Sequence, residues 1–286
     1  MTTKDLYYNL LKDLYGRVNV HVRQSVNNQM IVLYDDHRWL LNVLFALSKY
    51  SECPPDLIYF DAHDDAAPCL KKKELLEQIG VKNLKDATLR QFSTFVDYDQ
   101  RTDDGGWLTA ALELNLIGNV VNVGNRNNDN IRQMGGIYTS ADEIKHSVFE
   151  LSENIEHELG CRGKLGDACK EDENRSLRDL FGIEQHYTNC RSIHINRPYV
   201  LDFDLDYFTI SSKDGMTYGW TEKVFDSHFP DCSQQDLFLR LLIEGAQVIT
   251  ICREPGCCGS VGDSNRILEI LDRYYFEGQI RTDVTL

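Results

Sequence analysis

The sequence predicts an α/β protein with three layers, in which helices cover both faces of a mainly parallel central sheet. Two observations lead to this fold class. Short apolar runs rich in Val, Ile and Tyr alternate with longer segments of helical spacing, as in successive βαβ units. The apolar runs are also nearly continuous, which is typical of strands that are buried on both faces.

Five of these runs are expected to form the strands of the sheet. In chain order they are Met30–Tyr34, Leu57–Asp61, Asn119–Gly124, Tyr199–Leu205 and Gln247–Cys252. An edge strand is expected before them, because Val18, Val20 and Val22 alternate with polar residues in the pattern of a half-exposed strand.

The segments between the strands carry apolar residues at helical spacing. They predict helices at Arg38–Lys49, Lys71–Ile79, Trp107–Leu116, Ser140–Leu159 and Ser233–Ala246, after an opening helix at Lys4–Tyr15. Ser233, with Asp236 three residues later, fits the N-cap of the last of these helices. From about Gly160 to Arg197 the chain is polar with weak periodicity, which indicates a long excursion from the sheet. We find no repeat and no linker, so a single domain over residues 1–286 is expected.

Composition narrows the class of function. The 286 residues include 30 Lys and Arg against 45 Asp and Glu, a formal net charge of −15, which disfavours nucleic acid and anionic membranes as partners. No apolar run reaches the roughly 18 residues that span a bilayer, and the first residues lack the apolar stretch of a signal peptide. The nine cysteines are scattered through apolar contexts, as reduced core thiols are. A cytoplasmic protein is therefore expected.

Three apolar runs lead directly into carboxylates and histidines. These segments are Ile31–His37, Leu57–Asp65 and Val200–Asp206. Residues two apart in a strand point the same way, so we expect Asp61, His63 and Asp65 to converge, and Asp204 and Asp206 likewise. The carboxyl ends of parallel strands are where α/β sheets bind ligands.

A solvated strand end would explain any one of these segments alone, but their combination favours a metal site. Gathering five acidic groups costs about 1 kcal/mol per pair at about 4 Å even in bulk water, and more inside a protein. A pair of divalent cations would offset that repulsion. Mixed imidazole and carboxylate ligands suit Mn²⁺ or a related ion better than Ca²⁺.

These residues resemble motifs of the arginase (ureohydrolase) superfamily, whose relatives include metal-dependent deacetylases. The segment Asp61-Ala62-His63-Asp64-Asp65 is similar to the family's Asp-Ala-His-x-Asp signature, and Phe203-Asp204-Leu205-Asp206 to its Phe-Asp-x-Asp signature. His37 matches the place of the first histidine ligand, although its Asp35-Asp36 lead-in departs from the family's Gly-Gly-Asp. The resemblance runs from about Met30 to Pro255 as scattered motifs.

The resemblance implies a ligand set for two Mn²⁺ ions. One ion would be held by His37, Asp61, Asp65 and Asp204, and the other by Asp61, His63, Asp204 and Asp206. It also implies catalytic roles for Asp65, which would accept a hydrogen bond from the nucleophile, and for Asp206, which would pass a proton to the leaving nitrogen.

Glu254 separates branches of this superfamily. It follows the apolar run that ends at Cys252, and it looks like the glutamate with which ureohydrolases hold a guanidinium. Deacetylases instead carry Asp-x-His at the third motif, where this chain has Asp204-Leu205-Asp206. Besides Glu254, the expected substrate-binding residues are Asn125, Arg126 and Trp107. An exposed acid at a turn is the alternative for Glu254, and a polar turn is the alternative for Asn125 and Arg126.

Other features resemble the divergent branch of peptide arginases, which convert arginine to ornithine within a ribosomally made precursor peptide. They are Trp39 after the first histidine, the Asp204–Phe208 end of the third motif, and Gly105-Gly106-Trp107. The catalytic histidine of small-molecule arginases has no counterpart soon after Asp65, because the next histidine is His146. The proton donor is therefore not assigned by a histidine motif.

We thus expect a Mn²⁺-dependent amidinohydrolase that acts on peptidyl arginine. A small-molecule ureohydrolase for arginine or agmatine, a metal-dependent deacetylase, and a metal-binding protein that recognises peptides without turnover stay open as alternatives. The expected partners are an arginine-containing precursor peptide or a small guanidino compound, with no nucleic acid and no membrane. The sequence leaves the oligomeric state open, with a homo-oligomer among the expectations.

Overall fold

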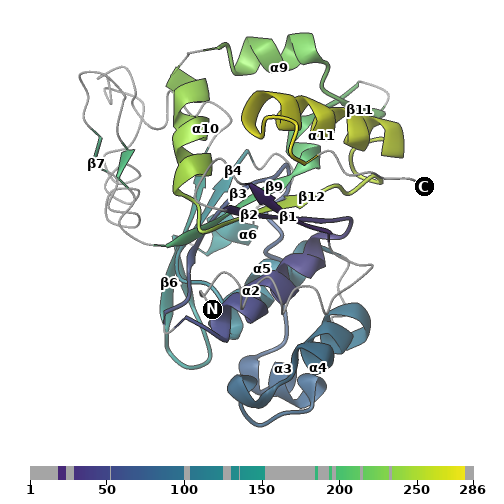
Figure 1. Ribbon diagram of the computed structural model, residues 1–286. Helices are drawn as coiled ribbons and strands as arrows, with labels where there is room; N and C mark the ends of the chain where they lie inside the picture. Colours follow the sequence, from purple (N-terminus) through teal and green to yellow (C-terminus); the bar gives the residue numbers. More distant parts are fainter. Residues whose placement is uncertain are drawn as a thin grey trace.

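The fold is described from a computed structural model of the chain (Figure 1). It describes residues 19–23, 29–51, 53–99, 104–124, 130–134, 136–151, 184–185, 193–194, 198–212, 215–231 and 234–280. Among these residues, every helix is too short or too polar to cross a lipid bilayer.

An eight-stranded sheet forms the middle layer, with the strand order β1-β2-β12-β9-β3-β4-β6-β5. The strands are β1 (Asn19–Arg23), β2 (Gln29–Tyr34), β3 (Asp56–Phe60), β4 (Val120–Val123), β5 (Ile137–Thr139), β6 (Lys145–Leu151), β9 (Tyr199–Asp204) and β12 (Val248–Cys252). The inner six strands run parallel, and β1 and β5 are antiparallel at the two edges. Because the inner strands run parallel, their carboxyl ends all meet at one edge of the layer.

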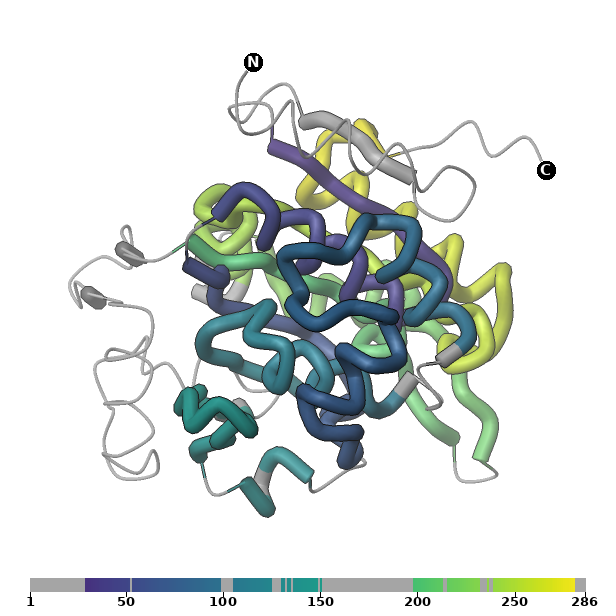
Figure 2. The backbone as a smooth tube through the Cα atoms, turned by 90° about the horizontal axis from the view of Figure 1, so that it is seen from below, coloured from purple at the N-terminus to yellow at the C-terminus, as the bar shows by residue number. Residues whose placement is uncertain are grey.

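Helices cover both faces of this sheet, as Figure 1 shows. On one side lie α9 (Glu222–His228), α10 (Gln234–Gly245) and α11 (Val261–Tyr275). On the other lie α2 (Leu40–Ser48), α3 (Lys72–Ile79), α4 (Leu89–Thr94) and α5 (Trp107–Glu113), which face the viewer in Figure 2. Each interface between helices and sheet encloses its own cluster of buried apolar side chains. The predicted three-layer α/β class is confirmed.

Successive side chains of one strand point alternately to the two faces of the sheet, and so they contribute to both apolar clusters. Along β2, Met30 and Val32 pack with the helices α2 and α5, whereas Ile31 and Leu33 pack in the core beneath α10 and α11. Every residue of β2, β3, β9 and β12 is buried. This is why the sequence shows continuous apolar runs at these strands rather than alternation.

The five predicted inner strands are confirmed to within one residue at each end. The predicted edge strand is confirmed as β1, which pairs antiparallel with β2. Four of the predicted helices are confirmed as α2, α3, α5 and α10, with a short 3-10 turn η1 (His37–Trp39) leading into α2. The helices α4, α9 and α11 were not predicted.

The helix predicted over Ser140–Leu159 is wrong in its first half, where the chain forms β6 beside β4. Ile144 and Val148 are four residues apart, which imitates helical spacing. The structure instead buries His146 and Val148 at the two-residue period of a strand. Pairing with the parallel strand β4 therefore decides the structure of this segment, against the helical spacing of its sequence. The remainder of that range, the helix expected at Lys4–Tyr15, the N-cap at Ser233 and nearly all of residues 160–197 lie outside the described residues.

Candidate metal centre

The residues singled out by the sequence meet at the carboxyl ends of four adjacent strands. His37 follows β2, Asp61 to Asp65 follow β3, Asp204 ends β9, and Glu254 follows β12. Asp206 lies in the 3-10 turn η5 (Leu205–Phe208) just after β9. Because β2, β12, β9 and β3 are consecutive in the sheet, these side chains face a common point.

One group of ligand atoms surrounds the imidazole of His37. Its Nδ1 lies 2.7 Å from Asp65 Oδ2, 3.1 Å from Asp204 Oδ2 and 3.3 Å from Asp61 Oδ2. His37 is fully buried, and the three carboxylates are at most 6% exposed. One nitrogen and three carboxylate oxygens therefore lie close together at a position that is buried from solvent.

A second group surrounds His63. Its Nδ1 lies 2.7 Å from Asp206 Oδ2 and 3.7 Å from Asp61 Oδ1. The atoms of Asp61, His63 and Asp206 lie within 4.8 Å of one another, as do those of His37, Asp61 and Asp204. Asp61 belongs to both groups, so the arrangement has two adjacent centres joined by a shared carboxylate.

Buried atoms without partners indicate that this cluster fits metal ions. His37 Nδ1, Asp61 Oδ2 and Asp206 Oδ2 are buried, yet among the described residues none of them has a hydrogen-bond partner outside the cluster itself. A buried polar atom without a partner costs about 1–3 kcal/mol, and here such atoms point at one another. Divalent cations would satisfy all three of them, and the mixed nitrogen and oxygen donors suit Mn²⁺ or a related ion.

Tight turns, and not strand alternation, bring the aspartates together. Residues 61–65 have already left β3, so the expected convergence is found but its predicted cause is wrong. Asp61 Oδ1 accepts the backbone N–H of His63 at 2.7 Å, and Asp204 Oδ1 accepts that of Asp206 at 2.9 Å. Each aspartate thereby stabilises a tight turn with one oxygen. Its other oxygen, Oδ2, lies near His37.

Backbone strain is concentrated at two of these positions. Asp65 has φ of 48° and Glu254 has φ of 30°, in the left-handed region that favours glycine. Non-glycine residues are held there at a cost of about 1–3 kcal/mol, and such strain clusters at functional sites. Asp65 is one of the candidate ligands, and Glu254 lies beside them.

Asp202 was not predicted as a site residue, although it precedes Asp204 by two positions. It is fully buried in β9, and its Oδ2 lies 2.7 Å from His37 Nε2. Its Oδ1 accepts hydrogen bonds from the hydroxyls of Tyr34 at 2.7 Å and Thr250 at 2.5 Å. The only sequence signal was that Asp202 is an acidic residue in the middle of an apolar run, two positions before Asp204.

Trp107 lies beneath the cluster. Its side chain is fully buried, its indole Nε1 donates to Asp65 Oδ2 at 2.5 Å, and its ring lies 4.7 Å from that of His37. Its contacts are therefore with two of the candidate ligands. Asn125 and Arg126, the other expected substrate-binding residues, lie outside the described residues.

Asp64 fixes the neighbouring loop. It is fully buried and accepts hydrogen bonds from Asn130 Nδ2 at 3.1 Å and from the Ile131 N–H at 3.0 Å. These two residues begin α6 (Asn130–Gln133). Asp64 thus ties that helix to the turn that carries the candidate ligands, a role that its place inside the Asp-Ala-His-x-Asp motif did not reveal.

Glu254 lies beside the cluster with its carboxylate nearly buried, at 8% exposure for the residue. One ligand atom of Glu254 lies within 4.8 Å of Asp204 and Cys252, and one within 4.8 Å of Asp206 and Cys257. Arg253 makes a two-pronged ion pair with Asp35, at 2.5 and 2.9 Å, which joins the turns after β12 and β2. That pair holds Glu254 next to His37. The backbone N–H of His37 donates to Glu254 Oε1 at 3.4 Å.

The protein raises most of the pKa values in this cluster. Burial raises the pKa of Asp61 and Asp204 well above the usual range, and neighbouring carboxylates add to the effect. Burial likewise raises the pKa of Glu254. The hydrogen bond with Asp206 raises the pKa of His63 to about 11. Without bound cations the cluster therefore retains protons at neutral pH, which is the behaviour of a site short of positive charge.

Asp206 behaves differently. Burial alone would raise its pKa, but the hydrogen bond and the charge of His63 lower it below the usual value. Its Oδ1 also accepts the Ala62 N–H at 3.1 Å. Asp206 is therefore a carboxylate over a wide pH range.

No protein-family model matches the chain, and no curated protein matches it. Among solved structures, the chain is similar to arginase from Bacillus cereus, with 13% identity and a TM-score of 0.46 over 98% of this chain and 78% of that one. It is also similar to proclavaminate amidino hydrolase from Streptomyces clavuligerus, with 14% identity, a TM-score of 0.44 and 86% of this chain covered.

A third similar structure is formimidoylglutamase from Bacillus subtilis, with 12% identity, a TM-score of 0.42 and 88% of this chain covered. The chain spans 61% of the length of the amidino hydrolase and of the formimidoylglutamase. The names of these neighbours include the arginase family that the sequence motifs resemble. At such identities and TM-scores the likeness carries no conclusion about activity, and the peptide arginase branch stays a prediction.

Proposed function

We propose that this protein is a Mn²⁺-dependent amidinohydrolase that hydrolyses the guanidino group of peptidyl arginine to ornithine and urea. One observation carries the proposal. Two histidines and three aspartates converge in two groups that share Asp61, Asp65 lies against His37 in the first group, and Glu254 lies beside them; among the described residues, buried ligand atoms of the cluster have no partner outside it. The first ion would be held by His37, Asp61, Asp65 and Asp204, and the second by Asp61, His63, Asp204 and Asp206.

The bound cations would supply a nucleophilic water at neutral pH, because a divalent ion lowers the pKa of water that it binds. Asp65 is placed to orient that water. Its Oδ2 is already fixed by the Trp107 indole and faces His37 Nδ1, so the carboxylate cannot rotate freely. A carboxylate held in one orientation can accept a hydrogen bond from the attacking water and aim its lone pair at the guanidinium carbon.

Glu254 would bind the guanidinium. Its carboxylate lies beside the cluster and belongs to neither ligand set, and a planar guanidinium forms two parallel hydrogen bonds with such a partner. Because Glu254 lies within 4.8 Å of ligand atoms of Asp204 and Asp206, a guanidinium on Glu254 would present its carbon to the space between the two groups. Near burial strengthens this charge pair.

Asp206 would move the proton. Attack of water on the guanidinium carbon forms a C–O bond, and the bond from that carbon to the side-chain nitrogen then breaks with the electron pair going to nitrogen. The nitrogen needs a proton to leave as an amine. Asp206 is ionised before reaction, so it can take a proton from the water and return it to the leaving nitrogen.

Peptidyl arginine is favoured over free arginine by the sequence features that resemble peptide arginases, namely Trp39, the Asp204–Phe208 segment and Gly105-Gly106-Trp107. The exposure of the cluster is compatible with a side chain entering from outside. His63 is the candidate ligand that reaches the surface, with 35% of its side chain exposed. A long arginine side chain can reach such a site while its backbone stays outside.

Mass spectrometry of the products tests the proposal. Manganese-loaded protein is incubated with arginine-containing peptides and, separately, with free arginine and agmatine, and urea is measured in each. Conversion to ornithine removes CN₂H₂, about 42 Da per arginine, because water replaces the leaving nitrogen in metal-assisted hydrolysis. Loss of that mass from peptides with little urea from the free compounds is the expected result.

Other outcomes identify the alternatives. Urea from free arginine or agmatine but not from peptides would make the protein a small-molecule ureohydrolase. Acetate released from acetylated lysine peptides would make it a deacetylase. Peptide binding that survives Asp65→Ala and Glu254→Ala, with no product from the wild type under any metal, would leave a recognition protein without turnover.

A further inference from the structure

We infer that Cys257 is a positioning residue for Glu254, whose thiol orients the carboxylate that binds the guanidinium and borders the path by which the substrate reaches it. This inference rests on the proposed function, in which Glu254 binds the guanidinium, and it adds a residue to that site. Its basis is the turn after β12, where the pair Cys257-Cys258 follows Glu254 closely. The pair lies beyond the segment, ending at about Pro255, over which the chain resembles the arginase superfamily.

A tight turn brings Cys257 back to Glu254. The carbonyl of Glu254 accepts the backbone N–H of Cys257 at 2.9 Å and that of Cys258 at 3.0 Å. The left-handed backbone of Glu254, with φ of 30°, begins this turn. The side chains of Cys257 and Glu254 lie close enough to form a hydrogen bond.

The turn is fixed to helix α11. Cys258 is buried, and its thiol donates to the Arg253 carbonyl at 3.2 Å. The hydroxyl of Ser264 in α11 donates to the same carbonyl at 2.8 Å. Cys257 is therefore carried by an anchored turn, which is what a residue needs in order to hold a neighbouring group in one orientation.

The Glu254 carboxylate receives hydrogen-bond donors from two directions. The backbone N–H of His37 lies 3.4 Å from Oε1. An ionised carboxylate only accepts hydrogen bonds, so the thiol is the donor in the bond between Cys257 and Glu254. A carboxylate has about four lone-pair positions, and these two donors therefore leave room for the two parallel bonds of a guanidinium.

A thiol orients this carboxylate without cancelling its charge. An unperturbed thiol has a pKa of about 8.5, and partial burial together with the charge of Glu254 raises the pKa of Cys257 further. The donor is therefore neutral at pH 7. A lysine or arginine at this position would instead form an ion pair with Glu254 and compete with the cationic substrate.

Cys257 and Glu254 differ in exposure. Glu254 is 8% exposed and Asp206 is 2% exposed, whereas Cys257 is an exposed residue. Ligand atoms of all three lie within 4.8 Å of one another. Because Cys257 is the member of this group that solvent reaches, a guanidinium that enters from outside passes beside the thiol on its way to Glu254.

Steady-state kinetics of manganese-loaded, full-length variants with an arginine peptide test the inference. Cys257→Ala removes the donor, whereas Cys257→Ser keeps a neutral donor of similar size. Glu254 would hold the guanidinium in the ground state and in the transition state alike, so the loss of its orientation should raise KM and leave kcat unchanged. A purely structural role would instead lower the fraction of active protein, and thus kcat, at constant KM.

We expect Cys257→Ala to raise KM by about 3- to 10-fold, which is the usual contribution of one hydrogen bond from a neutral donor. Cys257→Ser should return KM to within about twofold of the wild type. Elemental analysis should find the wild-type Mn²⁺ content in both variants, because Cys257 belongs to neither proposed ligand set. Cys53→Ala is the matched control, since Cys53 is an exposed cysteine before β3 at the opposite end of the sheet, and it should leave KM unchanged.

Thiol labelling gives a second readout that does not depend on turnover. Methyl methanethiosulfonate transfers its methylthio group to a cysteine sulfur, with methanesulfinate as the leaving group, and peptide mass mapping identifies the labelled cysteines. Arginine peptide kept at a saturating concentration should slow the labelling of Cys257 by about fivefold or more, because the occupied site shields the thiol. The labelling of Cys53 should not change.

Each contrary result has a distinct meaning. An unchanged KM in Cys257→Ala, or labelling of Cys257 that the peptide does not slow, would overturn the inference and leave the proposed function standing. The same holds if Cys257→Ser raises KM as much as Cys257→Ala. Wild-type protein that releases no urea from any guanidino compound would instead overturn the proposed function, and the inference with it.

Discussion

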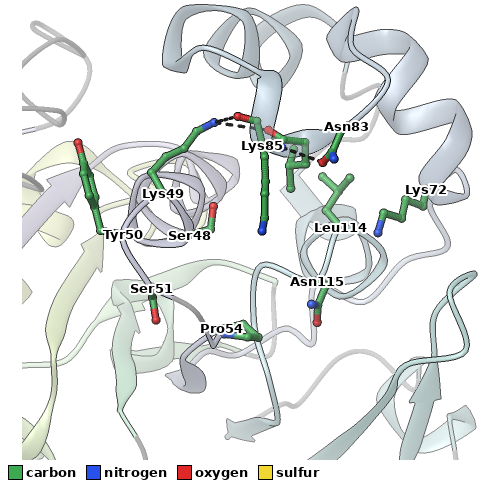
Figure 3. Close-up of a pocket in the computed structure, with 11 residues that line it drawn as sticks. Ser48, Lys49, Tyr50, Ser51, Pro54, Lys72, Asn83, Lys85, Leu114 and Asn115 are labelled. Atoms are coloured by element: carbon green, nitrogen blue, oxygen red, sulfur yellow. Dashed lines mark hydrogen bonds between the residues drawn. The ribbon is translucent and has the colours of Figure 1, made fainter.

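The two ends of the parallel sheet differ in what they offer a ligand. At the carboxyl ends of the strands lies the candidate metal centre, which is buried and, among the described residues, holds polar atoms without a partner outside the cluster. Near the opposite end lies a cavity of about 520 Å³ (Figure 3). It is lined by Ser48, Lys49, Tyr50, Ser51, Pro54, Lys72, Asn83, Leu84, Lys85, Leu114 and Asn115.

Two of the lysines that line this cavity already bind other parts of the chain. Lys49 Nζ donates to the carbonyls of Lys85 at 2.9 Å and Ala87 at 2.6 Å, as the dashed lines of Figure 3 show in part, and Lys72 pairs with Asp142. The lysine charge therefore joins the end of α2 to the chain before α4. The comparison teaches that buried polar atoms without partners, more than the volume of a cavity, distinguish a candidate functional site.

Asp204→Asn should have the largest effect. Asp204 contributes to the His37 group and, in the proposed ligand set, to both ions. Metal ions supply several kcal/mol of transition-state stabilisation, so kcat should fall by about 10³-fold or more. Urea release and metal content by elemental analysis measure the two effects. Full metal content with undiminished kcat would show that the carboxyl end is not the site of chemistry.

Glu254→Gln should lower kcat/KM for arginine substrates by about 10- to 150-fold, because a hydrogen bond to a charged group contributes about 1.5–3 kcal/mol. The bound Mn²⁺ content should stay at the wild-type value, since Glu254 lies outside the proposed ligand sets. Steady-state kinetics with elemental analysis of the same samples checks both statements. A variant that loses metal instead would make Glu254 a ligand and not a substrate-binding group.

Trp107→Phe should lower kcat by about 5- to 30-fold with little change in KM. The variant keeps the aromatic packing against His37 but removes the indole donor that fixes Asp65. Because the indole acts through Asp65 and does not touch the substrate, its loss should cost less than the full value of about 1.5–3 kcal/mol of a hydrogen bond to a charged group. A rise in KM at constant kcat would show that Trp107 contributes to substrate binding instead.

Mn²⁺ affinity should rise with pH. The pKa values of Asp61 and Asp204 are raised by burial, and that of His63 is raised to about 11 by Asp206, so the metal-free protein holds protons that cations must displace. Each released proton strengthens binding by up to about tenfold per pH unit below the raised pKa. Calorimetry in buffers of different ionisation heat counts these protons. Affinity that is constant between pH 6 and pH 9, about the range of the assay, would contradict the raised values.

The same pKa shifts predict the stability of the metal-free protein. Because the folded pKa of His63 lies above its unfolded value of 6.5, this group stabilises the fold fully below that pH and loses the contribution as the pH rises toward about 11. The melting temperature of metal-free protein should therefore fall as the solution becomes alkaline. Saturating Mn²⁺ should reduce that fall, because the metal-bound imidazole no longer titrates.

Lys85→Ala should have the smallest effect, and it is the control at the other end of the sheet. Lys85 is exposed, lines the cavity near the opposite end of the sheet and lies in the 3-10 turn Leu84–Asp86 before α4. Its substitution should leave kcat and Mn²⁺ affinity within about twofold, as surface substitutions away from a site usually do. A tenfold loss of activity would mean that the two ends of the sheet are coupled.

The sequence predicted those parts of the molecule that depend on local pattern. Asp61 and Asp204 could be found because each follows an apolar run at a strand end, and His37 because it matches the place of a motif. Asp202 escaped because a carboxylate inside a buried strand has no local signature. Its partners, Tyr34 and Thr250, are brought to it only by the register of three strands.

The failures have the same physical origin. The strand β6 was mistaken for a helix because its apolar spacing fits both, and only the neighbour β4 decides between them. Asp65 was expected to converge through strand alternation, whereas it does so through a left-handed turn. Long-range pairing and backbone strain are properties of the folded chain, so neither can be seen in a short window of sequence.

Anomalous X-ray scattering at the manganese edge, from crystals grown with Mn²⁺, tests the central claim most directly. The account predicts two peaks at the carboxyl end of the sheet, one beside His37 Nδ1 and one between His63 and Asp206, with no peak in the cavity at the opposite end. If soaking in excess Mn²⁺ gives no peak within bonding distance of His37, Asp61 or Asp204, the dinuclear centre and the hydrolysis proposed for it are both contradicted.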